Sequence, residues 1–281
     1  QKYSIYTFIP INLFEQFRRV ANLYFLFIAV LATTNLSPKD PLFTIFPLCV
    51  VLLISAIKEA YEDYQRYKQD KEINHRKSMV YRPNPENNGH DWKFREIFWK
   101  DIEVGDIVKI DKNKRSIPAD IMILQSSTKQ GLCNIETSNL DGETNLKIKQ
   151  AVGVTYSIKC GENGDEYPCQ NELQFKLESE APNERLNEWK GVLYFNNNSD
   201  PVSVTINQLL IRGCTLRNTD WIIGIVIYTG KESKLSLNNK ESPLKRSHVD
   251  TLVDYAIYFI FVVQFLLCIF GITAHYLYLK N

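Results

Sequence analysis

Hydrophobic residues follow two different patterns along this chain. Three long apolar runs, at residues 20–36, 41–57 and 255–279, contain no Asp, Glu, Lys or Arg. Runs of this length predict three helices that each cross a bilayer. Between residues 78 and 240 the apolar residues come instead in short stretches separated by Gly, Pro, Asn and Asp. That second pattern predicts the strands of a β domain.

The alternative for the long runs is a pair of buried core helices in a soluble protein, but uncharged segments of this length favour membrane spans. Arg18 and Arg19 precede the first run, and the turn between the first two runs holds only Lys39 beside Asp40. Basic residues also follow the second run and precede the third: Lys58, Arg66, Lys68, Lys71, Lys245 and Arg246. The positive-inside rule therefore predicts that the amino terminus and the central domain are cytoplasmic.

The second run continues into a charged segment, in which Glu62 and Arg66 have the i,i+4 spacing of a helical ion pair. We expect one helix that leaves the membrane as a stalk, although a merely solvated helix has the same charge pattern. The predicted organisation is a membrane hairpin with its stalk at 1–77, a β domain at 78–240, and a second stalk with the third span at 241–281.

Composition restricts the function further. The 281 residues have a formal net charge of +1, which gives no reason to expect nucleic acid as a partner. Cys160 and Cys169 would suit a small disulfide loop in an oxidising compartment, whereas a cytoplasmic domain predicts free thiols. The spacing of the six cysteines does not fit a zinc site. For the same topological reason, the sequon at Asn197 is expected to be unglycosylated.

The stretch NLDGETNLK at residues 139–147 is the main candidate for chemistry. Asp-Gly is a common hairpin dipeptide, because a type I′ turn requires positive φ at both central residues. Asp141, Gly142, Glu143 and Thr144 therefore have two interpretations, a plain tight turn or a turn that presents the Glu143 carboxylate. Taken alone, the stretch favours the plain turn.

Several motifs together resemble the P-type ATPases. VGDIVKI, then IPAD, then a Gly-Glu loop, then GIVIYTG is the order found in the actuator domain of that family. Other segments resemble its lipid-flippase branch, type IV: FEQFRRVANLYFLF, IKEAYEDYQRYK, SNLDGETNLK, PNERLNEWKG, LIRGCTLRNTDWIIGIVIYTG and PLKRSHVD. The resemblance covers essentially the whole chain. It implies an α+β membrane protein with three transmembrane helices and a cytoplasmic, mainly β actuator domain of distorted jelly-roll type.

This resemblance changes the interpretation of the DGET stretch. In P-type ATPases the actuator loop hydrolyses an aspartyl-phosphate that is carried by a separate domain. The matching Glu143 is implied to act as general base and to position the attacking water. Gly142 is implied to let the backbone approach the phosphate, and Thr144 to fix the water or the carboxylate. Asp141, where cation pumps carry threonine, is expected to shape the turn and assist docking.

The resemblance also implies ATP and Mg²⁺ as cofactors of the full-length enzyme, but we expect this chain to bind neither. No DKTG phosphorylation motif is present, and YTGK at 228–231 lacks its aspartate. GIVIYTGKE is not a Walker A loop, because its glycine spacing differs and no Ser or Thr follows Lys231. Gln1 is not a natural start, so we expect an amino-terminal piece that does not hydrolyse ATP alone.

For transport, the resemblance implies a phospholipid substrate moved toward the cytoplasmic leaflet and a two-span accessory beta subunit. It implies a multi-pass protein of the plasma membrane or of Golgi and endosomal membranes. Thr33, Thr34 and Asn35 close the first apolar run and are candidate headgroup contacts. We favour the competing interpretation that they only end the helix, since Thr and Asn are ordinary residues at helix ends.

Two other classes of protein stay open. A cation-transporting P-type ATPase would share the actuator plan, although the three apolar runs contain no carboxylate that could bind a cation. The second of these classes is a non-catalytic, membrane-anchored interaction module.

Overall fold

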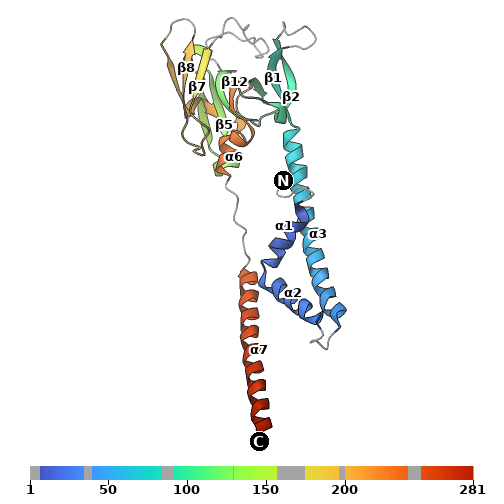
Figure 1. Ribbon diagram of the computed structural model, residues 1–281. Coiled ribbons are helices and arrows are strands. Elements are labelled where there is room, and N and C mark those ends of the chain that lie inside the picture. Colours follow the sequence, from blue (N-terminus) through green and yellow to red (C-terminus); the bar gives the residue numbers. More distant parts are fainter. Residues whose placement is uncertain are drawn as a thin grey trace. The chain divides into compact units, whose positions relative to one another are not determined.

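The computed structural model describes residues 7–34, 40–83, 92–128, 130–156, 175–195, 200–239 and 248–280. Contacts divide the chain into two compact units, residues 1–70 with 242–281 and residues 71–241. The first unit is helical, and the second is built mainly from antiparallel strands (Figure 1).

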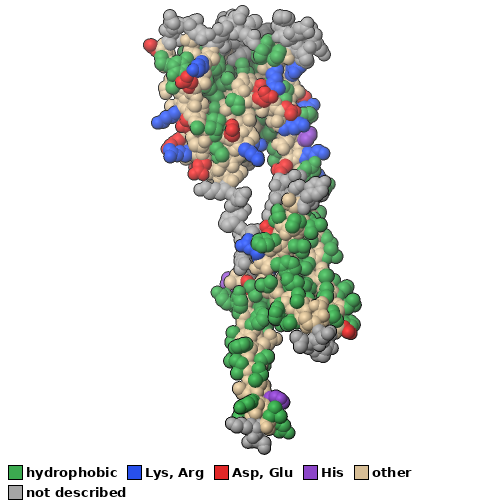
Figure 2. Space-filling model, viewed as in Figure 1, with side chains coloured by type: hydrophobic (Ala, Val, Ile, Leu, Met, Phe, Trp, Pro, Cys, Tyr) green, Lys and Arg blue, Asp and Glu red, His purple; other side chains and the backbone are tan. Residues whose placement is uncertain are grey.

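Among the described residues, the helical unit contains α1 (Phe8–Phe17), α2 (Val20–Ala32), α3 (Pro41–Asn74) and α7 (His248–Lys280). Among the described residues, α3 and the Thr251–Leu279 part of α7 are long and apolar enough to cross a membrane. Most of their large hydrophobic side chains are exposed, whereas the β unit carries a charged surface (Figure 2). Exposed apolar surface of this extent requires an apolar environment. These helices agree with the second and third predicted spans.

The first predicted span is shorter in the structure than in the sequence analysis. Helix α2 ends at Ala32, and its 13 residues extend about 20 Å, less than the hydrocarbon core of about 30 Å. Thr33 and Thr34 follow the last turn and donate their hydroxyls, at 2.7 and 2.6 Å, to carbonyl oxygens three residues earlier. The helix ends at Ala32, where these hydroxyls satisfy its last carbonyls, and the predicted end of the span at Leu36 lies outside the described residues.

Helix α3 continues beyond the apolar run to Asn74, through the segment where the sequence analysis expects a stalk. Arg66 lies 3.6 Å from the Glu62 carboxylate and 4.0 Å from that of Asp63, on one face of the helix. Exposed pairs of this kind stabilise a helix by only a few tenths of a kcal/mol each. The sequence of α3 changes from apolar to charged along its length. The two parts of the helix therefore suit different surroundings, but the helix does not end where the sequence changes.

The β unit contains twelve named strands among its described residues: β1 (Lys77–Pro83), β2 (Trp92–Phe98), β3 (Ile107–Asp111), β4 (Asp120–Ser126), β5 (Leu132–Glu136), β6 (Leu146–Gln150), β7 (Phe175–Ser179), β8 (Lys190–Phe195), β9 (Val202–Thr205), β10 (Leu209–Leu210), β11 (Thr215–Arg217) and β12 (Trp221–Tyr228). Short helical turns connect them: α4 (Ser138–Asp141), α5 (Gly153–Tyr156), α6 (Lys234–Asn238), η2 (Trp99–Asp101), η3 (Ile206–Gln208) and η4 (Gly230–Glu232). The predicted β domain is confirmed.

Three sheets organise these strands. The largest has the order β10-β4-β12-β3-β1-β2, and two three-stranded sheets have the orders β11-β5-β6 and β7-β8-β9. All their pairings are antiparallel. Every residue of β4 is buried, so this strand is covered on both faces. Burial of both faces explains why residues 121–124 of this strand are all apolar instead of alternating with polar residues.

Two buried charged residues connect α6 to the centre of the large sheet. The Asp120 carboxylate accepts hydrogen bonds from the backbone N–H groups of Arg212, at 2.8 Å, and Lys234, at 2.6 Å. The Lys234 ammonium donates to the side-chain oxygen of Asn183, at 2.6 Å, and to the carbonyl of Arg185, at 2.9 Å. Burial raises the pKa of Asp120 and lowers the pKa of Lys234. Such groups are tolerated inside because each has hydrogen-bond partners.

The contact between β4 and β12 leaves no room for a side chain at Gly224. A Cβ atom at this position would lie 2.4 Å from Cγ2 of Ile121 and 2.5 Å from the carbonyl oxygen of Met122. We predict that Gly224→Ala lowers the free energy of unfolding of the β unit by about 2 kcal/mol or more, because the two central strands must separate. All four tryptophans lie between residues 92 and 221, so their fluorescence reports denaturant unfolding of this unit.

Gly153→Ala is the matched control. Only Cε1 of Tyr156, at 4.0 Å, approaches a Cβ atom built there, and we expect a change within about 0.5 kcal/mol. Equal denaturation midpoints for Gly224→Ala and Gly153→Ala would contradict the tight packing of β4 and β12.

Candidate functional site

The DGET residues lie in the connection between β5 and β6. These strands pair antiparallel, and Glu136 opposite Leu146 is the last pair before the chain leaves the sheet. Residues 137–145 form the connection, and α4 occupies its first half. The two-residue type I′ turn considered for the sequence is therefore wrong. The Asp-Gly dipeptide instead ends a single helical turn inside a longer loop.

Gly142 is the C-cap of α4 and has a left-handed backbone with φ +76°. No atom lies within 4 Å of the position that a Cβ would take there. The glycine is therefore required by the backbone conformation and not by lack of space. Its predicted role in close approach to a phosphate stays a prediction.

The base of the loop is fixed by hydrogen bonds to neighbouring strands. Glu136 accepts hydrogen bonds at 2.7 Å from the Ser138 hydroxyl and from Nε of Arg217 on β11. Asn139 donates its side-chain amide to the carbonyl of Gly213, at 3.1 Å. Because these contacts come from β11 and from the turn that precedes it, the start of the loop cannot move without breaking them.

Asp141 is the internal anchor of the loop. Its carboxylate accepts hydrogen bonds from the Thr137 hydroxyl at 2.9 Å, from the backbone N–H of Glu143 at 3.0 Å, and from Nζ of Lys147 at 2.7 Å. The Lys147 ammonium is the main reason that the pKa of Asp141 is held at about 2. Asp141 is thus ionised at physiological pH, and its contacts support the predicted role in shaping the turn.

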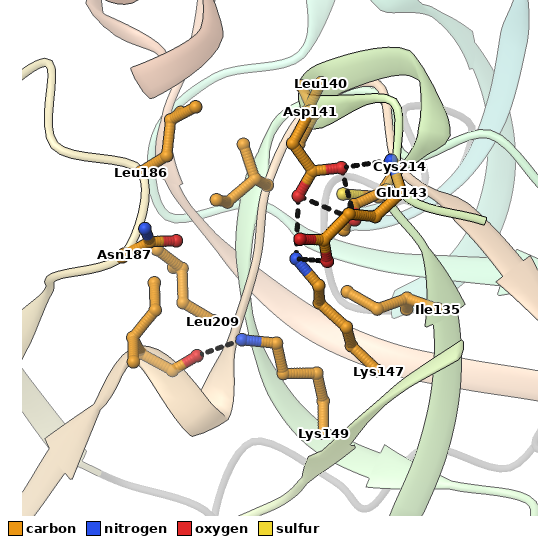
Figure 3. Close-up of a pocket in the computed structure, with 13 residues that line it drawn as sticks. Ile135, Leu140, Asp141, Glu143, Lys147, Lys149, Leu186, Asn187, Leu209 and Cys214 are labelled. Atoms are coloured by element: carbon orange, nitrogen blue, oxygen red, sulfur yellow. Dashed lines mark hydrogen bonds and ion pairs between the residues drawn. The ribbon is translucent and has the colours of Figure 1, made fainter. Parts of the chain in front are cut away.

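Glu143 follows this fixed base, and its carboxylate points toward the ammonium of Lys147 (Figure 3). Its side chain is 57% exposed, and Nζ of Lys147 lies 3.0 Å from its carboxylate. The two carboxylates raise the pKa of Lys147, so the ammonium stays charged between them. Thr144, the fourth predicted residue, follows directly and is also exposed. The arrangement offers an accessible carboxylate of defined position, which is what a general base requires.

A cleft of about 300 Å³ adjoins the loop. Asp141, Glu143, Lys147 and Lys149 line one side of it, and Leu186 with Asn187 faces them (Figure 3). Nζ of Lys149 donates to the carbonyl of Ile206, at 2.6 Å, at the far end of the cleft. Burial lowers the pKa of Lys149.

The loop does not fit a bound Mg²⁺. The space between the carboxylates of Asp141 and Glu143 is taken by the Lys147 ammonium, which a divalent ion would have to displace. No cluster of three His, Cys, Asp or Glu side chains with metal-ligand geometry occurs in the described part of the chain.

The described cysteines are free thiols, as predicted: Cys49, Cys133, Cys214 and Cys268. Burial raises the pKa of Cys133 and of Cys214 to about 12, so both stay protonated and unreactive. Cys160, Cys169 and the sequon at Asn197 lie outside the described residues.

The candidate headgroup contacts belong to the other compact unit. Thr33 and Thr34 are exposed at the end of α2, with hydroxyls bonded to their own helix. Asn35 lies outside the described residues. These bonds suit the helix-ending interpretation, and contact with a lipid headgroup stays a prediction.

Lys147 is the residue of this site to which the sequence analysis assigned no role. It stands four residues after Glu143, a spacing that predicts an ion pair only within a helix. Here the intervening residues are a loop followed by the start of β6. The contact depends on the path of the backbone, so no signal in the sequence marks it.

Comparison with known proteins agrees with this geometry. The family model described as P-type ATPase actuator domain matches residues 78–172. The matched part of the β unit includes the DGET loop, so an actuator domain of the P-type ATPase kind is present in this unit. A second family model, phospholipid-translocating ATPase N-terminal, matches residues 1–45.

Individual relatives define the branch. The chain is 43% identical over 270 residues to probable phospholipid-transporting ATPase 11 of Arabidopsis thaliana, covering 96% of the chain and 21% of that protein. It is 41% identical over 271 residues to human phospholipid-transporting ATPase IC, covering 95% and 20%. It is 38% identical over 262 residues to mouse phospholipid-transporting ATPase FetA, covering 93% and 21%. Over nearly its whole length the chain is similar to phospholipid-transporting P-type ATPases, and it spans about a fifth of the length of these relatives.

The low pKa of Asp141 leads to a prediction about acid stability. An unfolded Asp has a pKa of about 3.9, and the folded value of about 2 is lower. The ionised carboxylate therefore stabilises the fold above about pH 4, and this contribution is lost as the pH falls toward 2. Because the side chain is a third exposed, screening limits the contribution to about 1 kcal/mol or less.

We expect Asp141→Asn to lower the free energy of unfolding by up to about 1 kcal/mol at pH 7. Between pH 5 and pH 3, the free energy of unfolding should fall less in this variant than in the unsubstituted chain. Denaturant unfolding followed by tryptophan fluorescence at several pH values measures both effects. Asp200→Asn, at an exposed aspartate, is the control. An unchanged pH dependence in Asp141→Asn would show that the ion pair with Lys147 does not form in solution.

Proposed function

We propose that this chain is the amino-terminal part of an ATP-driven phospholipid flippase, which moves lipid toward the cytoplasmic leaflet. In this proposal the DGET loop dephosphorylates the aspartyl-phosphate intermediate. The observation that carries it is the exposed Glu143 carboxylate on a loop whose base is held by hydrogen bonds to strand β11 and to the turn that precedes it. The names of the relatives support the substrate class.

The chemistry assigned to Glu143 is the acceptance of one proton. A water molecule attacks phosphorus, the bond between phosphorus and the aspartyl oxygen breaks, and inorganic phosphate leaves. The water must lose a proton as it attacks, and a carboxylate at hydrogen-bond distance accepts that proton. Because the loop is anchored in advance, little conformational freedom has to be lost at this step.

ATP and Mg²⁺ serve the full-length protein in this proposal. ATP supplies the phosphoryl group that the aspartate receives, and both cofactors act at residues outside this chain. The contribution of the chain is limited to positioning and proton transfer at the actuator loop and to the first membrane helices.

The proposed location is a multi-pass arrangement in the plasma membrane or in Golgi and endosomal membranes, with the actuator domain on the cytoplasmic side. The two helices of spanning length and the basic residues of α3 beyond the apolar run support it. Thr33, Thr34 and Asn35 are proposed as part of the lipid path at the far end of the first apolar segment.

We also propose a two-span accessory beta subunit as partner of the complete protein. The expectation is that the complete protein, expressed in cells without such subunits, stays in the endoplasmic reticulum and lacks ATPase activity. Co-expression of a subunit should restore export and activity, as measured by surface labelling and phosphate release. Full activity and correct targeting in cells lacking every such subunit would refute the requirement.

The main test of the proposed function is Glu143→Gln in the full-length enzyme. The amide has nearly the same shape as the carboxylate, and Gly142 with Asp141 keeps the loop conformation, so the fold should survive. Phosphorylation from ATP should be unaffected, because another domain performs it. Decay of the phosphoenzyme should slow by about 10²- to 10⁴-fold, the range of a positioned acid–base group.

A pulse-chase of acid-stable phosphoenzyme with labelled ATP measures this decay. Glu178→Gln is a matched control, because Glu178 also forms an exposed ion pair with a lysine, Lys176, at 2.6 Å. Decay of the Glu143→Gln phosphoenzyme at the unsubstituted rate would exclude Glu143 as the dephosphorylation residue.

A further inference from the structure

One ammonium group joins both carboxylates of the DGET loop. Nζ of Lys147 lies 2.7 Å from Asp141 and 3.0 Å from Glu143 (Figure 3). Lys147 belongs to β6, which is paired along its length with β5. The two carboxylates instead belong to the end of α4 and to the loop after it. A side chain of the sheet therefore holds the loop residue that is assigned the reaction.

We propose that Lys147 is the positioning residue of Glu143 during dephosphorylation, an inference that rests on the proposed function of the loop. Its bond to Asp141 fixes the ammonium, and the fixed ammonium fixes the Glu143 carboxylate. Asp141 and Lys147 thus act as a pair, and the cation is the member that contacts Glu143 directly.

Geometry explains why Glu143 needs this support. Its side chain is 57% exposed, and a glutamate at a protein surface has three rotatable bonds that are otherwise unrestrained. The backbone N–H of Glu143 donates a hydrogen bond to Asp141, but this bond does not restrain the Glu143 carboxylate. The ammonium of Lys147 is the contact that does.

Charge supplies the second reason. The loop carries two carboxylates and must approach an acyl phosphate, which is itself anionic, so the approach is opposed by repulsion between like charges. Lys147 reduces the charge of the three-residue cluster from −2 to −1. An ammonium has three donors, and Asp141 and Glu143 occupy two of them, so one N–H stays available to a water or a phosphate oxygen.

The same contact has two competing interpretations. An exposed ion pair often contributes nothing measurable, in which case Lys147 has no effect on the reaction. Alternatively, Lys147 retains Glu143 and must release it before the reaction, so that its removal would accelerate dephosphorylation. The direction of the rate change separates these interpretations from the proposal.

The test is phosphoenzyme decay in the full-length enzyme carrying Lys147→Met, which removes the charge and keeps the length of the side chain. We expect normal phosphorylation from ATP and decay slowed by about 10- to 100-fold, less than for removal of the general base itself. Lys147→Arg should recover most of the rate, because it restores a cation. Lys176→Met, which breaks the exposed ion pair of β7, is the control and should decay at the unsubstituted rate.

Two further measurements distinguish positioning from a structural effect. In Lys147→Ala, ethylamine in the medium should increase the decay rate in proportion to its concentration, because it replaces the missing ammonium. In the Glu143→Gln background, Lys147→Met should cause no further slowing, since a residue that acts through Glu143 has nothing left to position.

Decay of Lys147→Met at or above the unsubstituted rate would overturn the proposal, and so would additive slowing in the double variant. If Glu143→Gln alone decays at the unsubstituted rate, the proposed function of the loop fails instead. The single variants therefore separate failure of the inference from failure of the function on which it rests.

Discussion

The close packing of β4 against β12 is the constraint on which the actuator domain depends. β4 is buried on both faces, and Gly224 lets β12 pass beside it where any side chain would collide with Ile121. Packed interiors tolerate such contacts only when neighbouring elements are held in register. The register of the large sheet determines where Asp120 lies. The Asp120 carboxylate accepts hydrogen bonds from the backbone N–H groups of Arg212 and of Lys234 in α6, so it holds both segments in place.

The DGET loop obtains its rigidity from this framework and not from its own sequence. Gly213, one residue after the segment that Asp120 holds, accepts the hydrogen bond from Asn139 of the loop. The side chain of Arg217 on β11 holds Glu136 at the start of the loop. The buried framework is therefore connected through a few hydrogen bonds to an exposed carboxylate. In the proposed function this connection matters, because flexibility within the loop would misplace Glu143.

Exposure and fixation are opposing demands at the tip of the loop. In the proposed function Glu143 has to be accessible, so burial cannot hold it, and a single surface ion pair is weak. Lys147, on the adjacent strand β6, contacts the carboxylates of both Asp141 and Glu143. The ion pair with Asp141 therefore supports the ion pair with Glu143. Helix α4 contributes by ending at Gly142, whose left-handed backbone turns the chain outward.

The sequence by itself determined the membrane helices, the β domain and the candidate loop. These features are local: the length of an apolar run, the spacing of turn residues and the order of family motifs are all visible along the chain. Tertiary structure decided where α2 ends, that Asp141 closes a helical turn rather than a hairpin, and that Lys147 meets both carboxylates. It also decided that the charged Lys234 is buried. Each of these depends on which groups the folded backbone brings within hydrogen-bond distance, and spacing along the chain does not contain that information.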